Sequence, residues 1–171
     1  MDKVFRKIAE EENALYSNQS EKYNKVLGSL RPDNLYHLEI PYKGATIYLT
    51  NVVEFLAIGE VYVHLPKKPK DQEFEINTRS HIIQLLVPNK NQIRIKTKFK
   101  KLKSLLKNSM AYFRMQKLID KTQFEPLIYG KNKDGVFIIK TEYNLAFKRR
   151  DEVLRPIIQF YKELIDLYSE N

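Results

Sequence analysis

The stretch LYHLEIPYKGATIYLT, which runs from Leu35 to Thr50, decides the fold class of this chain. Apolar and polar residues alternate on both sides of the segment PYKG, and this alternation is typical of strands that bury one face. PYKG itself has the composition of a turn. Because two strands joined by so short a link run antiparallel, the stretch predicts a β-hairpin.

Similar alternation extends outward from this hairpin. It recurs at Glu60–Leu65, at Glu73–Thr78 and at Gln92–Lys98. A second hairpin is predicted around Asp134–Gly135, because this dipeptide favours a two-residue turn between strands. The segment Ser80–Val87 (SHIIQLLV) fits either a short helix or a buried strand. Together these segments predict a mostly antiparallel sheet of about five to seven strands.

Three helices are predicted beside the sheet, at residues 2 to about 28, from Lys98 to Lys121 and from Asp151 onward. Pro156 is costly beyond the first turn of a helix, so the last helix either starts near Arg155 or is kinked there. The apolar stripes of the three helices are Phe5, Ile8, Ala9, Leu15, Tyr16, Tyr23, Val26 and Leu27; Phe99, Leu102, Leu106, Met110 and Phe113; and Leu154, Ile157, Ile158, Tyr161, Leu164, Ile165 and Tyr168. The expected fold class is therefore α+β, with an N-terminal, a central basic and a C-terminal helix.

The length of 171 residues and the hydrophobic content of 43% suit a single domain, residues 1–171, with a substantial core. No Gly/Ser-rich or Pro-rich linker divides the chain. The lack of cysteine excludes disulfides, thiolate metal sites and a cysteine nucleophile. No apolar run reaches the roughly 18 residues of a membrane-spanning helix, and the first 23 residues contain no apolar run of the signal-peptide type. We therefore expect a cytoplasmic protein without a transmembrane segment.

The signatures of phosphate-binding loops, dinucleotide sites, serine hydrolases and zinc hydrolases are missing from the sequence. The three histidines, His37, His64 and His81, do not have a spacing typical of a metal site. Glu73 and Glu75 share one face of a predicted strand, roughly 7 Å apart by the strand rise, but such a pair more often forms a solvated face. We therefore predict no catalytic site, no metal site and no cofactor, and we expect a protein that is not an enzyme.

The formal net charge of +9 is concentrated in one segment, Gln92–Lys121. This segment holds ten basic residues and a single acidic residue, Asp120, whereas the rest of the chain is balanced at 20 basic and 20 acidic residues. A localised positive field attracts anionic ligands, while a diffuse charge mainly keeps a protein soluble. The segment is therefore the main functional candidate in the sequence.

On one continuous helix, most of these basic residues would form a ridge beside the apolar stripe. Like charges four residues apart repel each other, so a helix that needed only solubility would also contain glutamates. The alternative is a solvated helix face whose lysine stems cover the edge of the stripe. The predicted ridge consists of Lys96, Lys100, Lys103, Lys107, Arg114, Lys117 and Lys121.

We expect a binding or protein-interaction module that contacts an anionic partner through this ridge. The partner is either an acidic protein or a nucleic acid bound independently of its sequence, because lysine suits phosphate contacts better than base recognition. Binding to an anionic membrane surface would require exposed apolar residues on this helix. We expect the apolar stripe of the helix to pack in the core instead. The N-terminal helix at residues 1–28 is expected to dock peripherally, and pairing with a second copy of the chain is its alternative role.

Overall fold

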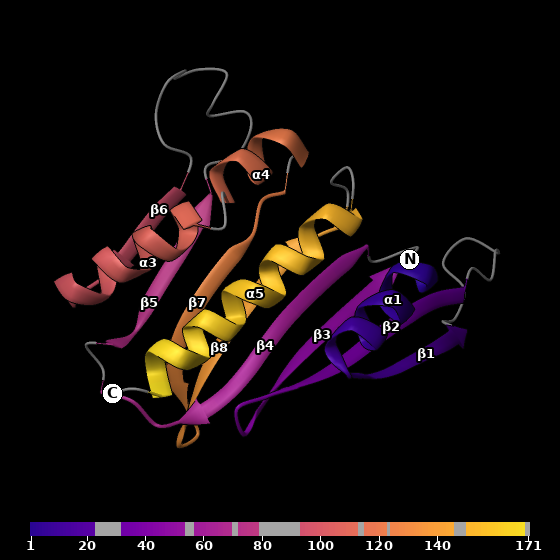
Figure 1. Cartoon of the computed structure of the whole chain (residues 1–171), viewed down its shortest axis with the longest axis horizontal. Coiled ribbons are helices and arrows are strands. Elements are labelled where there is room, and N and C mark those ends of the chain that lie inside the picture. Colours follow the sequence, from indigo (N-terminus) through magenta and orange to yellow (C-terminus); the bar gives the residue numbers. More distant parts are fainter. Residues whose placement is uncertain are drawn as a thin grey trace.

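The computed structural model describes residues 1–22, 32–53, 57–69, 72–78, 93–112, 115–122, 124–145 and 150–169. Over these residues the chain forms an eight-stranded sheet in which every neighbouring pair runs antiparallel. The helices all lie on the same side of this sheet (Figure 1). The α+β class is confirmed, and the sheet is slightly larger than expected.

The order of the strands in the sheet differs from their order along the chain. The strands are β1 (Leu15–Lys22), β2 (Pro32–Tyr42), β3 (Ala45–Val53), β4 (Ile58–Pro66), β5 (Phe74–Thr78), β6 (Ile93–Thr97), β7 (Leu127–Lys133) and β8 (Val136–Asn144). The helices are α1 (Asp2–Glu12), α3 (Lys100–Tyr112), α4 (Met115–Thr122) and α5 (Arg150–Ser169). In the sheet the strand order is β1-β2-β3-β4-β8-β7-β5-β6. The hairpin β7–β8, the last in the sequence, therefore fills the middle of the sheet.

Both predicted hairpins are present, and their turns have the same geometry. Lys43 and Gly44 join β2 to β3 with φ angles of 46° and 79°, and Asp134 and Gly135 join β7 to β8 with 50° and 84°. Two consecutive positive φ angles define the hairpin turn whose twist matches that of the flanking strands. Glycine reaches this region without a steric penalty, so the turn sequences fix the two registers.

The predicted N-terminal helix is wrong beyond Glu12. The helix α1 ends there, and Asn13 takes a left-handed conformation with φ 50°, which asparagine tolerates better than most residues. Residues 15–22, predicted as helix, instead form β1 at the edge of the sheet. Phe5 and Ile8 are fully buried in the core of the same chain. Residues 23–28 of the predicted helix lie outside the described residues.

The C-terminal helix α5 lies over the middle of the sheet and runs roughly along β4 (Figure 1). Its predicted apolar stripe is confirmed, because all seven residues from Leu154 to Tyr168 that make up the stripe are buried. The helix begins at Arg150 and contains Pro156, so a start near Arg155 is wrong. The hydroxyl of Tyr161 donates to the carbonyl of Val61 on β4 at 2.7 Å, and burial raises the pKa of this hydroxyl well above its usual value.

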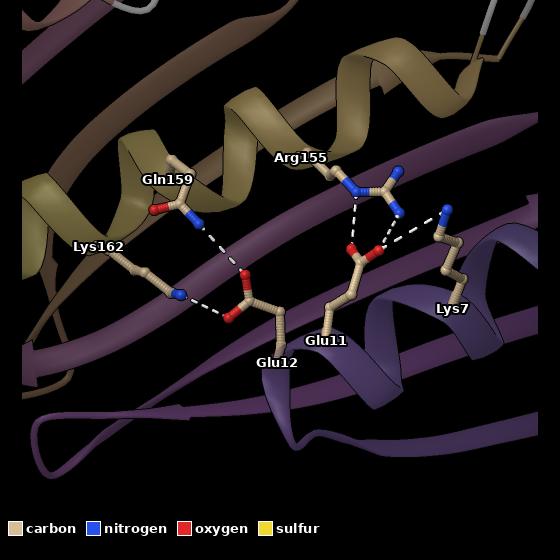
Figure 2. Close-up of polar contacts among 6 residues, drawn as sticks. All are labelled: Lys7, Glu11, Glu12, Arg155, Gln159 and Lys162. Carbon is tan, nitrogen blue, oxygen red and sulfur yellow. Dashed lines mark hydrogen bonds and ion pairs between the residues drawn. The ribbon is translucent and has the colours of Figure 1, made fainter.

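Helices α1 and α5, from opposite ends of the chain, are joined by side-chain contacts (Figure 2). Arg155 binds both carboxylate oxygens of Glu11, from Nε at 2.8 Å and from Nη2 at 2.9 Å. Glu12 accepts from Lys162 at 2.5 Å and from the side-chain amide of Gln159 at 3.2 Å. The N-terminal helix is thus held to the C-terminal helix as well as to the sheet.

Two further sequence expectations concern the segment Ser80–Val87 and the absence of a transmembrane segment. Ser80–Val87, which fitted either a helix or a strand, lies outside the described residues. Among the described helices, none combines the length and the apolar composition needed to cross a membrane.

Candidate functional site

The basic segment Gln92–Lys121 does not form one helix. Its first described residues are strand β6, and the rest is divided between α3 and α4. The predicted continuous helix from Lys98 to Lys121 is therefore wrong. Arg114, a member of the predicted ridge, lies between α3 and α4 and outside the described residues.

The positions of the buried residues explain why the segment is divided. Leu102, Leu106 and Met110 of α3 are buried as predicted, and Met115 and Ile119 of α4 are buried too. At about 100° per residue, Met115 and Ile119 would lie roughly 180° and 140° from Leu106 on a continuous helix. Two separate helices allow both sets to reach the core. The five-residue step from Met110 to Met115 was the signal in the sequence.

Lys100, Lys103 and Lys107 form what we call the lysine face, on the solvent side of α3. All three are exposed, and their spacing of three and four residues places them on one side of the helix. Leu102 and Leu106 anchor the helix through the neighbouring, buried side. None of the three ammonium groups has an ion-pair partner within the described part of the chain. The lysine face is therefore an uncompensated positive surface on a helix that is fixed by its apolar side.

The remaining members of the predicted ridge lie elsewhere. Lys96 is on strand β6 and pairs with Glu75 of β5 at 2.8 Å. Lys121 pairs with Glu152 of α5 at 2.6 Å. Lys117 is exposed on α4. The structure thus keeps three of the seven predicted residues together, and it does not place the described members on one ridge.

The sheet face opposite the helices carries a row of aromatic side chains that the sequence analysis did not identify as a surface. The rings of His37 and Tyr48 stack with centroids 6.1 Å apart and planes 24° apart. Tyr48 and Tyr62 stack more closely, at 4.9 Å and 18°. His64 follows, with its ring 5.4 Å from that of Tyr62. In Figure 1 the helices lie in front of the sheet, so this uncovered face points away from the viewer.

Beside the aromatic row lies a hollow of about 370 Å³, which we call the trough. In the strand register, Lys140 of β8 lies between Tyr62 of β4 and Tyr129 of β7, and Ile138 likewise lies between His64 and Lys131. The central strand therefore forms the floor of the trough and the outer strands form its walls. The lining residues are Glu60, Tyr62, His64, Tyr129, Lys131, Lys133, Ile138 and Lys140.

The lysine on the floor of the trough binds two carboxylates and offsets one of their two negative charges. Lys140 binds Glu60 at 2.7 Å and Glu142 at 3.1 Å. Partial burial alone would lower the pKa of Lys140, but its hydrogen bonds to Glu60 and Glu142 outweigh burial, and the net pKa is raised. Burial, together with the charge of Glu60, raises the pKa of Tyr62. Burial, together with the charge of Glu142, likewise raises the pKa of Tyr129.

Lys131 and Lys133 add positive charge that no described carboxylate pairs with. Both are exposed on β7, and neither ammonium group forms an ion pair with a described residue. The ammonium of Lys131 lies 4.5 Å from the ring centroid of Tyr129, within the range of a cation–π contact. One wall of the trough is therefore both aromatic and cationic.

A second hollow, of about 830 Å³, connects the trough to the lysine face. Tyr129 and Lys131 of the trough line it from β7, and Lys103 of the lysine face lines it from α3. Lys96 and Lys98 also line it, as do the carboxylates of Glu73 and Glu75. Side chains from both surfaces therefore meet in one hollow, where four lysines outnumber two carboxylates.

The two carboxylates considered for catalysis, Glu73 and Glu75, both bind neighbouring strands or side chains. Glu75 is bound to Lys96 at 2.8 Å, and this hydrogen bond lowers the pKa of the carboxyl. Glu73 accepts from the backbone N–H of Asn132 at 3.1 Å and from its side-chain amide at 3.2 Å. Over the described ranges, no group of three His, Asp, Glu or Cys side chains is placed to hold a metal ion. His81 lies outside these ranges.

Comparisons with family models, with curated protein sequences and with solved structures give no match for this chain.

The sequence analysis found the lysine face but missed the trough. The tyrosines at 48, 62 and 129 each occupy a polar position of an alternating strand, and this was the available signal. It could not be used, because β4, β8 and β7 become neighbours only through pairing between segments far apart in the sequence.

Proposed function

We propose that this protein is a non-enzymatic binding module that contacts an anionic partner through the lysine face of α3. The single observation that supports this proposal is the set of three exposed ammonium groups at Lys100, Lys103 and Lys107, without ion-pair partners among the described residues. Surface lysines without counter-charges attract anions at long range, and the attraction weakens as salt increases.

The arrangement of α3 favours a binding role over a purely solvating one. Elsewhere in the described structure, Lys43, Lys140 and Lys162 each have a carboxylate partner within hydrogen-bonding distance. The lysine face has no such partner on its own helix, because α3 contains no acidic residue. The proposal includes a cytoplasmic location, which is consistent with the absence of cysteine.

The partner under this proposal is an acidic protein, and a nucleic acid bound independently of its sequence is the second candidate. Continuity of the positive surface into the hollow lined by Lys96, Lys98, Lys103 and Lys131 favours the second candidate, because a polymer of phosphates can follow a basic path.

The test compares two triple variants with equal change in charge. Lys100, Lys103 and Lys107 are changed to Glu in one variant, and the exposed Lys3, Lys7 and Lys67 in the control. Each substitution lowers the charge by two, so both variants fall from a formal +9 to +3. Retention on a heparin column and binding of duplex DNA, followed by fluorescence anisotropy at about 50 mM salt, are the measurements.

We expect the lysine-face variant to lose most of its affinity for heparin and DNA, and the control variant to keep most of it. Loss of three phosphate contacts should flatten the log–log dependence of the DNA affinity on salt by roughly 3. An acidic protein partner would show weaker salt dependence and a fixed stoichiometry. Equal behaviour of the two variants would mean that only net charge matters, and the proposal would fail.

A further inference from the structure

We propose that the trough on the uncovered face of the sheet binds unpaired bases of a single-stranded nucleic acid, whose phosphates reach Lys131, Lys133 and the lysine face. The inference rests on the proposed function in that it names the anionic partner. It is carried by a separate observation, the half-buried aromatic rings of Tyr62 on β4 and Tyr129 on β7, beside lysines that form no ion pair with a described residue.

The geometry of the aromatic row makes the trough the open end of a stack. Tyr62 has one ring face against Tyr48, at 4.9 Å and 18°, so its other face is directed along the row toward β8 and β7. Stacked aromatic rings keep their centroids about 4.5–7 Å apart. The backbones of β4 and β7 are separated by one strand, which is about 10 Å, so a planar base that lies over Lys140 can reach both Tyr62 and Tyr129.

The charges near the trough favour a polyanion over a cationic or neutral partner. Glu60 and Glu142 are both bound to Lys140, and Glu75 is bound to Lys96. Lys131 and Lys133 have no such partners among the described residues, so their charges remain available for phosphate. Sequence-tolerant binding of single strands combines aromatic stacking with a basic groove in this way.

A duplex would not use the trough in the same manner. Bases in a duplex are stacked on each other and expose only their edges, whereas a single strand can turn its bases toward aromatic side chains. The hollow shared by Tyr129, Lys131 and Lys103 gives the same strand a path from the trough to α3. The inference therefore predicts a preference for single strands over duplexes of equal length.

The experiment uses the full chain, a fluorescein-labelled oligo(dT) of about 20 nucleotides and a duplex of the same length. Tyr62 and Tyr129 are changed together to Leu in one variant and to Phe in the matched control, which keeps both rings. We expect the Leu variant to bind oligo(dT) about tenfold more weakly or worse, and the Phe variant to bind within about threefold of the parent. Retention on heparin should be nearly unchanged in both.

Two results would overturn the inference while leaving the proposed function intact: equal affinity of the Leu variant and the parent for oligo(dT), or equal or tighter binding of the duplex by the parent. Failure of the proposed function would instead appear as unchanged heparin and DNA binding in the lysine-face variant.

A second measurement needs no substitution in the protein. The chain contains 11 tyrosines and no tryptophan, so its intrinsic fluorescence comes from tyrosine alone. Stacking of bases on Tyr62 and Tyr129 should quench part of this emission when oligo(dT) is added. An oligonucleotide that contains 5-bromouracil should crosslink on irradiation to peptides that contain Tyr62 or Tyr129. Crosslinks confined to peptides of α1 and α5 would contradict the inference.

Discussion

Arg155 on α5 and Glu11 on α1 face each other across the helical layer and form two side-by-side hydrogen bonds, of 2.8 Å and 2.9 Å. The planar guanidinium matches both carboxylate oxygens, which fixes the relative orientation of the two side chains. The two residues are 144 positions apart in the sequence. This contact and the neighbouring pair of Glu12 and Lys162 join the two terminal helices.

The first prediction concerns the titration of Glu11. The hydrogen bond from Arg155 lowers the pKa of this carboxyl below its usual value. Because the folded-state pKa is lower than the unfolded one, the pair stabilises the protein above the usual pKa of glutamate, and this contribution is lost as pH falls through the lowered pKa. In Arg155→Gln, the pKa of Glu11, followed by NMR, should rise toward its usual value. An unchanged pKa would mean that the pair does not form in solution.

The second prediction concerns the pair of Glu12 and Lys162. Their side chains are only 17% and 18% exposed, so Lys162→Met leaves a largely buried carboxylate with the amide of Gln159 as its remaining contact in this cluster. The free energy of unfolding should fall by more than the roughly 1 kcal/mol of an exposed pair and by less than the roughly 3–5 kcal/mol of a fully buried one. Urea denaturation measures the change. Lys3→Met on the exposed side of α1 is the control and should be nearly neutral.

The third prediction concerns the core beneath α5. Ile158 and Leu164 are 0% and 1% exposed, so Ile158→Ala and Leu164→Ala should each lower the free energy of unfolding by about 2–5 kcal/mol. Denaturant midpoints would show this, with Glu163→Ala on the same helix as a control of small effect. A loss below about half a kcal/mol at both core positions would contradict the packing of α5 on the sheet.

The fourth prediction concerns Gly59 on β4. A Cβ at this position would lie 2.2 Å from Cε2 of Tyr143 and 2.4 Å from Oδ1 of Asn51, which are joined by a buried hydrogen bond of 2.8 Å. Neither group can move without breaking that bond, so Gly59→Ala should cost about 1–3 kcal/mol or more. Thermal melts would measure it, with the neighbouring exposed Ile58→Ala as the control. If Gly59→Ala left the stability unchanged, the ring of Tyr143 could not lie against Gly59 as it does in the structure.

Local patterns in the sequence predicted many of the elements. Alternation predicted β2, β3, β4, β5 and β6, and the pairs Lys43–Gly44 and Asp134–Gly135 marked the two hairpin turns. Spacing of three and four residues predicted α5 and the buried side of α3. These predictions succeeded because each depends on residues within one or two turns of a helix, or within one strand and its turn.

Three elements were misjudged because a distant contact outweighed the local pattern. Leu15 and Tyr16 continue the spacing of α1, but residues 15–22 pair their backbone with β2 as an edge strand. The central helix is divided because Met115 and Ile119 must reach the same core as Leu102. Pro156 is accommodated inside α5, where Leu154, Ile157 and Ile158 are buried, so packing outweighs the local cost of the proline.

By itself, the sequence determined the α+β class, the two hairpins, the apolar side of the C-terminal helix and the exposed lysines of α3, because periodicity and turn chemistry act between near neighbours. Only the tertiary structure decided that β7–β8 enters the sheet between β4 and β5. That placement brings Tyr62 and Tyr129 to the two sides of Lys140, although the two tyrosines are far apart in the sequence. Strand order is set by which buried faces pack together across the whole chain, and no local pattern encodes it.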